Sequence, residues 1–325
     1  MKAIFLDKPD GLLIVKEVRT PVPGPGEVLV KMKAAPVNPS DLARIKRSDN
    51  NLETFIPGLE GSGDVVAAGK GFLPRLWMGK RVACSAEYAT SGTWSEYMVT
   101  KAGKCFPLNA KVDYDQGSMM LVNPLTAIGF IEIVRAQRHR AIINNAAASA
   151  LGRMVELLGK KHNIPVINIV RSNKHLERLT GSGSKYVLDS SAPSFIDDLG
   201  KLSHDLNATI LFDSTCSRQI EKMTGVIPYG SSVIIYGNLT GEENIMINPR
   251  ILIDKDIRIS GFYVGARTKE NSLFKNIMNL REVSRLMRSE MKVSIQGRFP
   301  PDRAQEAIDT YLANMSAGKV LIVND

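Results

Sequence analysis

The residues best suited to bind a ligand follow two predicted strands in the middle of the chain. The first strand, Ala141–Asn145, runs into the small residues Ala146 to Gly152 at the start of a predicted helix. Backbone N–H groups at a helix start bind anions, whatever the small side chains are. The loop lacks the full G-x-G-x-x-G pattern and keeps only Gly152. Taken alone, it fits either a dinucleotide site or simple packing at a tight turn.

The second strand, Val166–Val170, gives a more specific signal. A site for NAD usually carries Asp or Glu at the end of this strand, to accept a hydrogen bond from the ribose 2′-OH. This chain has Arg171 there and no acidic residue until Glu177. A guanidinium suits a 2′-phosphate, which it contacts through two charge-assisted hydrogen bonds. We therefore predict NADP(H) as the cofactor, the alternative being that Arg171 is a solvated arginine at a strand end.

Metal-binding residues are scarce in this sequence. There are 3 cysteines (Cys84, Cys105 and Cys216) and 4 histidines, with no C-x-x-C pair and no two histidines four residues apart. A structural zinc site of four cysteines is therefore impossible by count. Three scattered thiols favour a reducing compartment. We interpret Cys84 as an ordinary buried thiol, because nothing beside it in the sequence would depress its pKa.

The composition is that of a folded globular protein, with 44% hydrophobic and 23% charged residues in 325. A formal net charge of +9 favours anionic partners such as phosphates. The basic residues are spread along the chain, so we expect a solvated surface and no nucleic-acid partner. No stretch reaches about 18 uncharged apolar residues, so we expect no membrane span. No targeting segment is visible, and we expect a location in the cytoplasm or the mitochondrial matrix.

These candidate residues need a scaffold, and the pattern of the chain predicts a two-domain α/β protein. The first third has short apolar runs separated by Gly/Pro clusters, which is typical of a β-rich domain. From about residue 121, predicted strands and helices alternate, which favours a doubly wound, parallel sheet of six strands. The last segment is too small to bury a core alone and should fold back on the first domain. We therefore predict a β-rich substrate domain from 1–120 and 264–325, and a Rossmann domain from 121–263.

Motifs along nearly the whole chain resemble the medium-chain dehydrogenase/reductase superfamily. They are Pro36-Val37-Asn38-Pro39-Ser40-Asp41, Gly58-Leu59-Glu60-Gly61-Ser62-Gly63, Gly92-Thr93-Trp94-Ser95-Glu96-Tyr97, Asn123-Pro124-Leu125-Thr126-Ala127, Ile235-Tyr236-Gly237, Gly261-Phe262-Tyr263 and Ala317-Gly318-Lys319-Val320. The sequence looks most like the zinc-free branch of quinone reductases and 2-enoyl thioester reductases, especially those of the mitochondrial type. The resemblance implies that the β-rich domain is a GroES-like catalytic domain. In the zinc-dependent relatives, Cys and His hold the metal near the positions of Asn38 and Leu59, so we expect no metal here.

The resemblance also implies roles for individual residues. Asn38 would sit at the hydride-transfer end and Lys319 would touch a phosphate or ribose of the cofactor. The remaining cofactor-binding residues would line the pyrophosphate (Ala148, Ser149, Ala150 and Leu151), hold the 2′-phosphate (Arg171, Ser172 and Asn173), frame the nicotinamide half (Tyr236, Gly237, Asn238, Leu239, Phe262, Tyr263 and Val264) and reach the nicotinamide ribose (Asn123 and Thr126). Alternatively, Asn38 only caps a turn, Tyr236 and Phe262 are core residues, and Lys319 is a surface charge.

Two departures from the family pattern bear on the activity. Asp213 is followed by 214–218, Ser-Thr-Cys-Ser-Arg, where the family usually has a Gly-Gly pair. The segment 46–55 lacks the tyrosine that protonates the substrate in the enoyl reductases. We therefore expect a zinc-independent, NADPH-dependent oxidoreductase that transfers hydride to a quinone or an α,β-unsaturated carbonyl, with Asn38, or less favourably Tyr88, steadying the charge on oxygen.

Two alternatives stay open. In the first, the chain is a trans-2-enoyl thioester reductase that acts on CoA or acyl-carrier substrates and has its proton donor elsewhere. In the second, it is a catalytically inactive, reductase-like structural subunit. Family members often pair along the sixth strand, which corresponds to Ile251–Gly261, so we expect a homodimer.

Overall fold

The computed structural model describes residues 1–6, 12–47, 55–87 and 91–325. Their backbone divides into two units, which are described separately. Unit 1 comprises Met1–Pro124 and Ile277–Asp325, and unit 2 comprises Leu125–Asn276. Unit 2 thus continues past residue 263, where the sequence placed the end of the Rossmann domain. Two ion pairs explain this, because Arg267 and Lys275 lie 3.7 Å and 2.9 Å from the carboxylate of Glu132.

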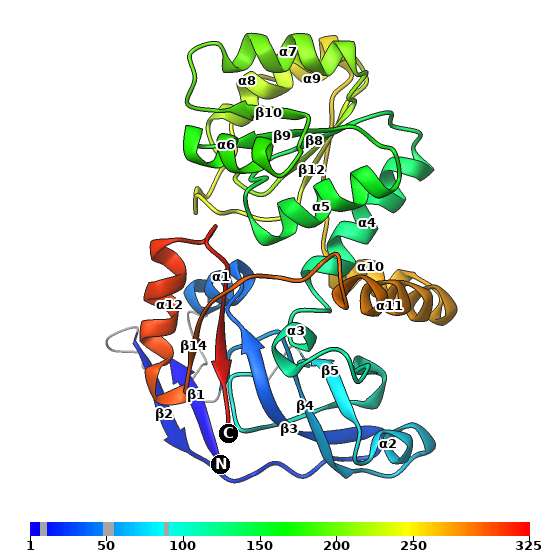
Figure 1. Cartoon of the computed structure of the whole chain (residues 1–325), viewed down its shortest axis with the longest axis vertical. Coiled ribbons are helices and arrows are strands. Elements are labelled where there is room, and N and C mark those ends of the chain that lie inside the picture. The colour runs from blue at the N-terminus through cyan, green and yellow to red at the C-terminus, as the bar shows by residue number, and fades with distance from the viewer. Residues whose placement is uncertain (7–11, 48–54, 88–90) are drawn as a thin grey trace. The chain divides into compact units, whose positions relative to one another are not determined.

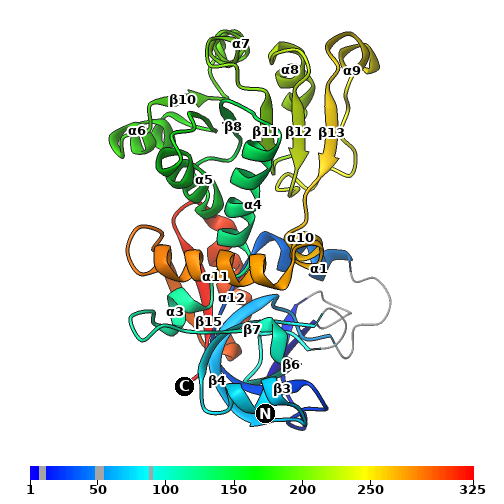
Figure 2. The ribbon, with the colours of Figure 1, turned by 90° about the vertical axis from the view of Figure 1, so that its right-hand side faces the viewer.

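Unit 2 contains the predicted doubly wound sheet of 6 strands. All neighbouring strands are parallel, in the order β10-β9-β8-β11-β12-β13, and Figure 2 shows β8, β11, β12 and β13 side by side. The strands are β8 (Ile142–Asn144), β9 (Val166–Val170), β10 (Tyr186–Asp189), β11 (Ile210–Asp213), β12 (Ser232–Ile235) and β13 (Arg258–Gly261). The chain changes direction across the sheet between β8 and β11. Ligands of such sheets bind beyond the carboxyl ends of the strands at this switch point.

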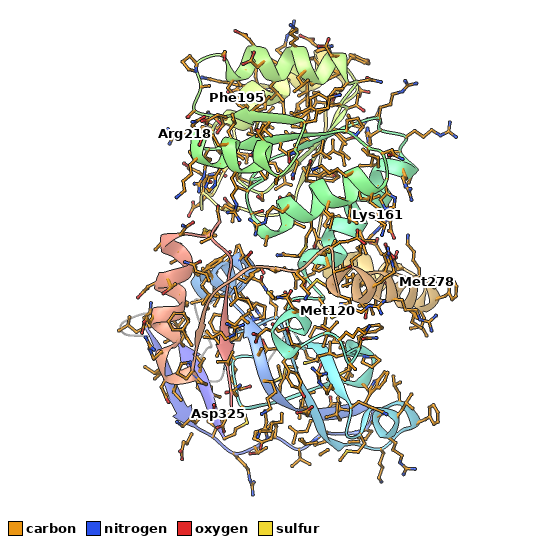
Figure 3. The ribbon with its side chains drawn as sticks, viewed as in Figure 1. Met120, Lys161, Phe195, Arg218, Met278 and Asp325 are labelled. Carbon is orange, nitrogen blue, oxygen red and sulfur yellow. The ribbon has the colours of Figure 1, made fainter. Side chains whose placement is uncertain are left out.

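Helices cover both faces of this sheet (Figure 1). One face carries α7 (Phe195–Asp205), α8 (Gln219–Val226) and α9 (Pro249–Lys255), and the other carries α4 (Asn123–Ala136), α5 (Ala150–Lys161) and α6 (Asn173–Gly181). Phe195, labelled in Figure 3, is 3% exposed and packs in the apolar core under α7, together with Ile143 and Leu211. The unit ends with α10 (Val264–Glu270) and the start of α11 (Leu273–Met287).

Unit 1 is built on a sheet of 7 strands in which both ends of the chain meet. The order is β14-β15-β3-β4-β5-β7, and β6 also pairs with β3. The strands are β3 (Glu27–Pro36), β4 (Glu60–Ala68), β5 (Arg81–Ser85), β6 (Tyr97–Lys101), β7 (Cys105–Pro107), β14 (Ile295–Phe299) and β15 (Lys319–Val323). The antiparallel pairing of β15 with β3 shows that the C-terminal segment folds back on the first domain, as predicted.

Smaller elements complete unit 1. A separate antiparallel pair is formed by β1 (Lys2–Leu6) and β2 (Leu13–Glu17). The α-helices are α1 (Pro39–Arg47), α2 (Phe72–Trp77), α3 (Tyr114–Gly117), α12 (Ala304–Ala313) and the larger, C-terminal part of α11. The core around Trp94 combines β1, β3, β15 and α12, so it joins residues from both ends of the chain. Across the described residues of both units, no helix is long and apolar enough to cross a membrane.

Candidate functional site

The loop between β8 and α5 presents backbone donors at the switch point of the unit 2 sheet. Ser149 caps α5, and its Oγ accepts a hydrogen bond from the N–H of Gly152 at 3.0 Å. The N–H groups of Ala150 and Leu151 belong to the first helical turn, where no earlier helical carbonyl can accept from them. Gly152 is retained because an added Cβ would lie 2.6 Å from Ala147 Cα. The helix start therefore fits a phosphate, although the glycine pattern is incomplete.

A buried hydrogen-bond network ties this loop to the end of β11. The Asp213 carboxylate is fully buried and accepts from Asn145 Nδ2, from Thr215 Oγ1 at 2.8 Å and from Cys216 N at 2.8 Å. Cys216 has φ of +50°, a left-handed conformation that usually favours glycine. The altered segment after Asp213 is thus held in a glycine-like turn by the Asp213 side chain. The network gives the loop a defined shape without the family's Gly-Gly pair.

A group of basic side chains surrounds the carboxyl end of β9. Arg171 is exposed there, and Ser172 is the N-cap of α6. The nearest acidic residue along the chain, Glu177, accepts a hydrogen bond from Asn173 Nδ2 at 2.6 Å. Four further basic side chains lie near Arg171: Arg153 from α5, and Lys174, His175 and Arg178 from α6. We call Arg153, Arg171, Lys174, His175 and Arg178 the basic cluster.

Arg153 connects the basic cluster with the loop before α5. Its guanidinium is half-buried and donates a hydrogen bond to the carbonyl oxygen of Ala148 at 2.5 Å. Burial, and next the charge of Arg178, lower its pKa. The structure therefore brings the predicted pyrophosphate loop and the predicted 2′-phosphate residues to one edge of the unit 2 sheet.

The residues predicted to frame the nicotinamide follow β12 and β13. Tyr236 and Phe262 rest against Phe130 of α4, with ring centroids 4.9 Å and 5.0 Å apart, and Phe130 also stacks on Phe212 at 3.9 Å. Tyr236 and Phe262 are half-buried, so each ring packs against Phe130 and is also partly exposed to solvent. Tyr263 is 50% exposed.

The other residues predicted to bind the nicotinamide half follow β12 and β13 or lie at the start of α4. The N–H of Leu239 donates to the carbonyl of Ser214 at 2.8 Å, which anchors the 237–239 segment beside the end of β11. Gly237 and Val264 are half-buried and Asn238 is exposed. Asn123 and Thr126 lie in the first turn of α4, half-buried and buried respectively.

In unit 1, Asn38 belongs to a buried polar cluster with Glu60 and Lys319. The three residues are 1%, 1% and 3% exposed. Asn38 Nδ2 donates to Glu60 Oε1 at 3.1 Å, and Lys319 Nζ donates to Asn38 Oδ1. An ammonium only donates and a carboxylate only accepts, so these two partners fix which way the amide faces. Lys319 is therefore neither a surface charge nor free to move independently of Asn38.

The other atoms of this cluster are also occupied. Glu60 Oε2 accepts from the N–H groups of Leu121 and Val122 at 2.9 Å and 3.0 Å. Burial raises the pKa of Glu60, and the positive charge of Lys319 opposes that rise. Burial lowers the pKa of Lys319, against the effect of Glu60. Lys319 and Glu60 thus stabilise each other's charged forms inside the protein.

Asp41 adds a second carboxyl group to the same region. Its Oδ2 accepts from the backbone N–H of Asn38 at 2.9 Å, and its own N–H donates to the carbonyl of Asn38 at 3.0 Å. Asn38 therefore caps α1 through its backbone, while its side chain is left for the buried cluster. Burial raises the pKa of Asp41 to about 7, and the bond from Asn38 N–H opposes this.

Metal ligands do not gather in the described part of the chain. Within residues 1–6, 12–47, 55–87 and 91–325, no group of 3 or more His, Cys, Asp or Glu side chains could hold a metal ion. The thiol of Cys84 is fully buried, 3.9 Å from Met32 Sδ, and burial raises its pKa. Our interpretation of Cys84 as an ordinary buried thiol is confirmed.

Several known proteins with similar sequences or folds are named reductases. Residues 24–110 match the alcohol dehydrogenase GroES-like domain. The mitochondrial enoyl-[acyl-carrier-protein] reductase of Arabidopsis thaliana is 26% identical over 249 residues, which are 73% of this chain and 64% of that protein. The quinone oxidoreductase of Rattus norvegicus is 21% identical over 319 residues, 97% of this chain and 94% of the relative.

The fold comparison covers both units. A solved structure from Mesorhizobium loti, provisionally named an NADPH:quinone reductase, has a TM-score of 0.91 and 28% identity, and the match covers 100% of this chain and 98% of that one. The sequence and the fold are similar to those of the medium-chain dehydrogenase/reductase superfamily that the motifs resemble. The predicted fold class, a GroES-like domain with a Rossmann domain, is confirmed.

The structure adds candidate site residues that the sequence did not single out. Arg153, His175 and Arg178 join the basic cluster, and Glu60 and Asp41 join Asn38 in unit 1. The sequence does contain a signal for His175 and Arg178. They are three residues apart on a predicted helix, and residues at that spacing lie on the same helix face. The second candidate donor, Tyr88, lies outside the described residues, as does most of the 46–55 segment.

Proposed function

We propose that the chain is a zinc-independent, NADPH-dependent reductase that transfers a hydride to a quinone or an α,β-unsaturated carbonyl. The observation that carries the proposal is the basic cluster at the carboxyl end of β9, beside the start of α5. The names of the similar proteins support the same class, since they are quinone oxidoreductases and enoyl reductases.

The residues present fit NADPH. The 2′-phosphate needs several cationic donors, and Arg171 and Arg153 provide them at the edge where Ser172 and Asn173 begin α6. The pyrophosphate needs backbone donors, which Ala148 to Leu151 provide at the start of α5. The glycine-like turn at Cys216 and the segment 236–239 would border the nicotinamide half.

When bound, NADPH supplies the hydride, which is the difficult part of the chemistry. The chain must then hold the acceptor and stabilise the negative charge that develops on its oxygen. Asn38 Nδ2 carries two hydrogens and gives one of them to Glu60. In our proposal the second hydrogen is the donor to the acceptor oxygen. Lys319 keeps that amide from turning over, because it holds Oδ1 on the other side.

The test of the function uses the pure protein. NADPH and NADH are titrated while nicotinamide fluorescence is recorded, and then a quinone and a crotonyl thioester are added in separate assays. We expect NADPH to bind more tightly than NADH and the quinone to be reduced. The absence of NADPH binding would contradict the proposal, and binding without turnover of either acceptor would favour an inactive, reductase-like subunit.

An enoyl thioester reductase is the second candidate, favoured by the match to the Arabidopsis thaliana enzyme. Turnover of the crotonyl thioester in preference to the quinone would support it. Its proton donor would lie elsewhere than the expected tyrosine position. The location in the cytoplasm or the mitochondrial matrix stays a prediction, which organelle fractionation tests.

Replacing Arg171 with alanine should weaken NADPH binding by about 10- to 100-fold, because a charge-assisted contact to the 2′-phosphate is lost. NADH has no such phosphate, so its dissociation constant should stay within about twofold. Fluorescence titration of both cofactors measures the effect. Arg250→Ala is a suitable control, since Arg250 lies on α9 with a 79% exposed side chain. Equal weakening of both cofactors would contradict our placement of the 2′-phosphate.

We also propose that the chain forms a homodimer along β13. This strand ends the unit 2 sheet, and three of its four residues, Arg258, Ser260 and Gly261, are exposed. On the preceding helix, Ile253 is 71% exposed. An open strand edge beside apolar surface favours pairing with an identical edge. Light scattering should give twice the chain mass of 35.6 kDa, and a single-chain mass would contradict the proposal.

A further inference from the structure

His175 is the one group of the basic cluster whose charge can change near neutral pH. It lies in the first turn of α6, four residues after Arg171. Its Nδ1 atom is buried and has no hydrogen-bond partner among the residues that the structure describes. A buried, unpaired ring nitrogen is unusual, because buried polar atoms are normally hydrogen-bonded. The unpaired nitrogen therefore leaves the imidazole free to take up a proton.

The surroundings of His175 are almost entirely positive. The charges that act on its imidazole come from its own helix (Arg178 and Lys174), from the end of β9 (Arg171) and from α5 (Arg153). The acidic residue of the same helix, Glu177, accepts from Asn173. Burial, and then these four positive charges with Arg178 first, lower the pKa of His175. The imidazole is therefore neutral in the free protein at pH values near 7.5.

We propose that His175 is a proton acceptor of the 2′-phosphate site, so that binding of NADPH is coupled to protonation of this imidazole. The inference rests on the proposed function, because it assumes that the basic cluster receives the 2′-phosphate. It adds a residue that helps the protein to distinguish NADPH from NADH. It also adds a dependence of that distinction on pH.

The physical reason is a reversal of the local charge. A phosphate monoester carries close to two negative charges above its second pKa of about 6. Placed among Arg153, Arg171 and Arg178, it would offset the positive charges that hold the imidazole neutral. The protonated ring would then carry a positive charge close to the phosphate.

The sign of the pH dependence follows from linkage. A group that binds more protons in the complex than in the free protein weakens binding as the pH rises. The dissociation constant for NADPH should therefore increase with pH, by at most about tenfold per pH unit for a single proton. NADH lacks the 2′-phosphate, and its dissociation constant should stay constant over the same range.

Isothermal titration calorimetry of the full chain at pH 7.5 provides the test. Titrations in several buffers with different ionisation enthalpies give the number of protons exchanged on binding. We expect NADPH binding to take up a substantial fraction of one proton and NADH binding to take up close to none. At this pH the phosphate itself is almost fully ionised, and any proton that it lost would be released, which has the opposite sign.

Two variants locate the proton. His175→Gln should abolish the proton uptake and remove most of the pH dependence of NADPH binding. His204→Gln is the matched control, because His204 is an exposed histidine on α7 of the same unit. It should behave as the wild type does. Circular dichroism checks that both variants fold. If His175→Gln does not fold, proton NMR of the wild-type imidazole provides a second measurement, since NADPH but not NADH should shift it to the protonated position.

The outcomes separate this inference from the proposed function. Tight, NADPH-selective binding without proton uptake would overturn the inference and leave the function standing. Proton uptake that persists in His175→Gln would also overturn it. A failure to bind NADPH, or equal affinity for NADPH and NADH, would overturn the proposed cofactor site itself.

Discussion

Replacing Lys319 with methionine should lower the free energy of unfolding by about 3–5 kcal/mol at pH 7.5, as expected when a buried carboxylate loses the positive charge that offsets its burial. Lys319 is 3% exposed, and its charge opposes the burial of the Glu60 carboxylate. Methionine fills similar space but has neither charge nor donor. Glu60 would then be buried with N–H donors but without a cation. Chemical denaturation followed by circular dichroism measures the loss.

The loss should grow with pH. Burial already raises the pKa of Glu60, and removing Lys319 removes the charge that opposes this rise. A carboxyl group with a raised pKa in the folded state costs stability above its unfolded pKa, because the unfolded chain gains more by ionising. The effect of Lys319→Met should therefore be small near pH ~4, where the unfolded carboxyl is also largely protonated, and larger at pH 8.

A control and a rescue make this prediction specific. Lys101 of β6 has a 55% exposed side chain that lies 3.4 Å from Glu27, so Lys101→Met should cost less than about 1 kcal/mol. The double variant Lys319→Met, Glu60→Gln removes both charges, and it should recover stability to within about 1 kcal/mol of the wild type. Unchanged unfolding of the single variant, or no recovery in the double variant, would contradict the electrostatic coupling of Lys319 and Glu60.

Replacing Asn38 with alanine should lower kcat by about 10²- to 10³-fold, the usual effect of removing one donor to a developing oxyanion. The expectation rests on the proposed function, in which the second Nδ2 hydrogen of Asn38 contacts the acceptor oxygen. The geometry supports it, because Glu60 and Lys319 together fix the orientation of the amide. Steady-state kinetics with NADPH and a quinone measure the change.

The interpretation needs the fold and the cofactor affinity to be checked separately. Asn38 also braces the buried cluster, so the variant should lose some stability as well. The fluorescence-derived dissociation constant for NADPH should remain within about twofold, since Asn38 lies in unit 1 and the basic cluster in unit 2. Ser40→Ala, at an exposed position of α1, should change neither quantity. A kcat within about tenfold of the wild type would mean that Asn38 only braces the fold.

Much of the fold could be predicted because it depends on local patterns. The strands β8 to β13 are short apolar runs separated by helical segments, and their alternation favours a parallel sheet with right-handed connections. The predicted β9, Val166–Val170, has the bounds found in the structure. The short helices α2 and α3 were not predicted, and neither were α9 and α10. Both α9 and α10 have 7 residues and no buried residue, so they lack the apolar periodicity on which the prediction depends.

The candidate site was predicted only in part. Arg171 could be placed because it directly follows a strand whose end has a defined role in dinucleotide-binding sheets. Arg153 could not, because it comes from a different helix and reaches the same region through the carbonyl of Ala148. In the sequence, the segment after Asp213 departs from the Gly-Gly pattern of the family, which kept an inactive subunit open as an alternative. In the structure, Asp213 holds Cys216 in the turn that glycine would otherwise adopt.

The sequence by itself determined the order of strands and helices, the shortage of metal ligands and the basic residue that follows β9. The partner of Lys319 was decided by the tertiary structure alone. Lys319 and Asn38 are 281 residues apart, and no local periodicity relates them. They meet because β15 pairs antiparallel with β3, with Leu321 opposite Pro36. That pairing places the start of β15 beside the residue that follows β3, and the low polarity of the interior then makes a buried ammonium depend on Glu60.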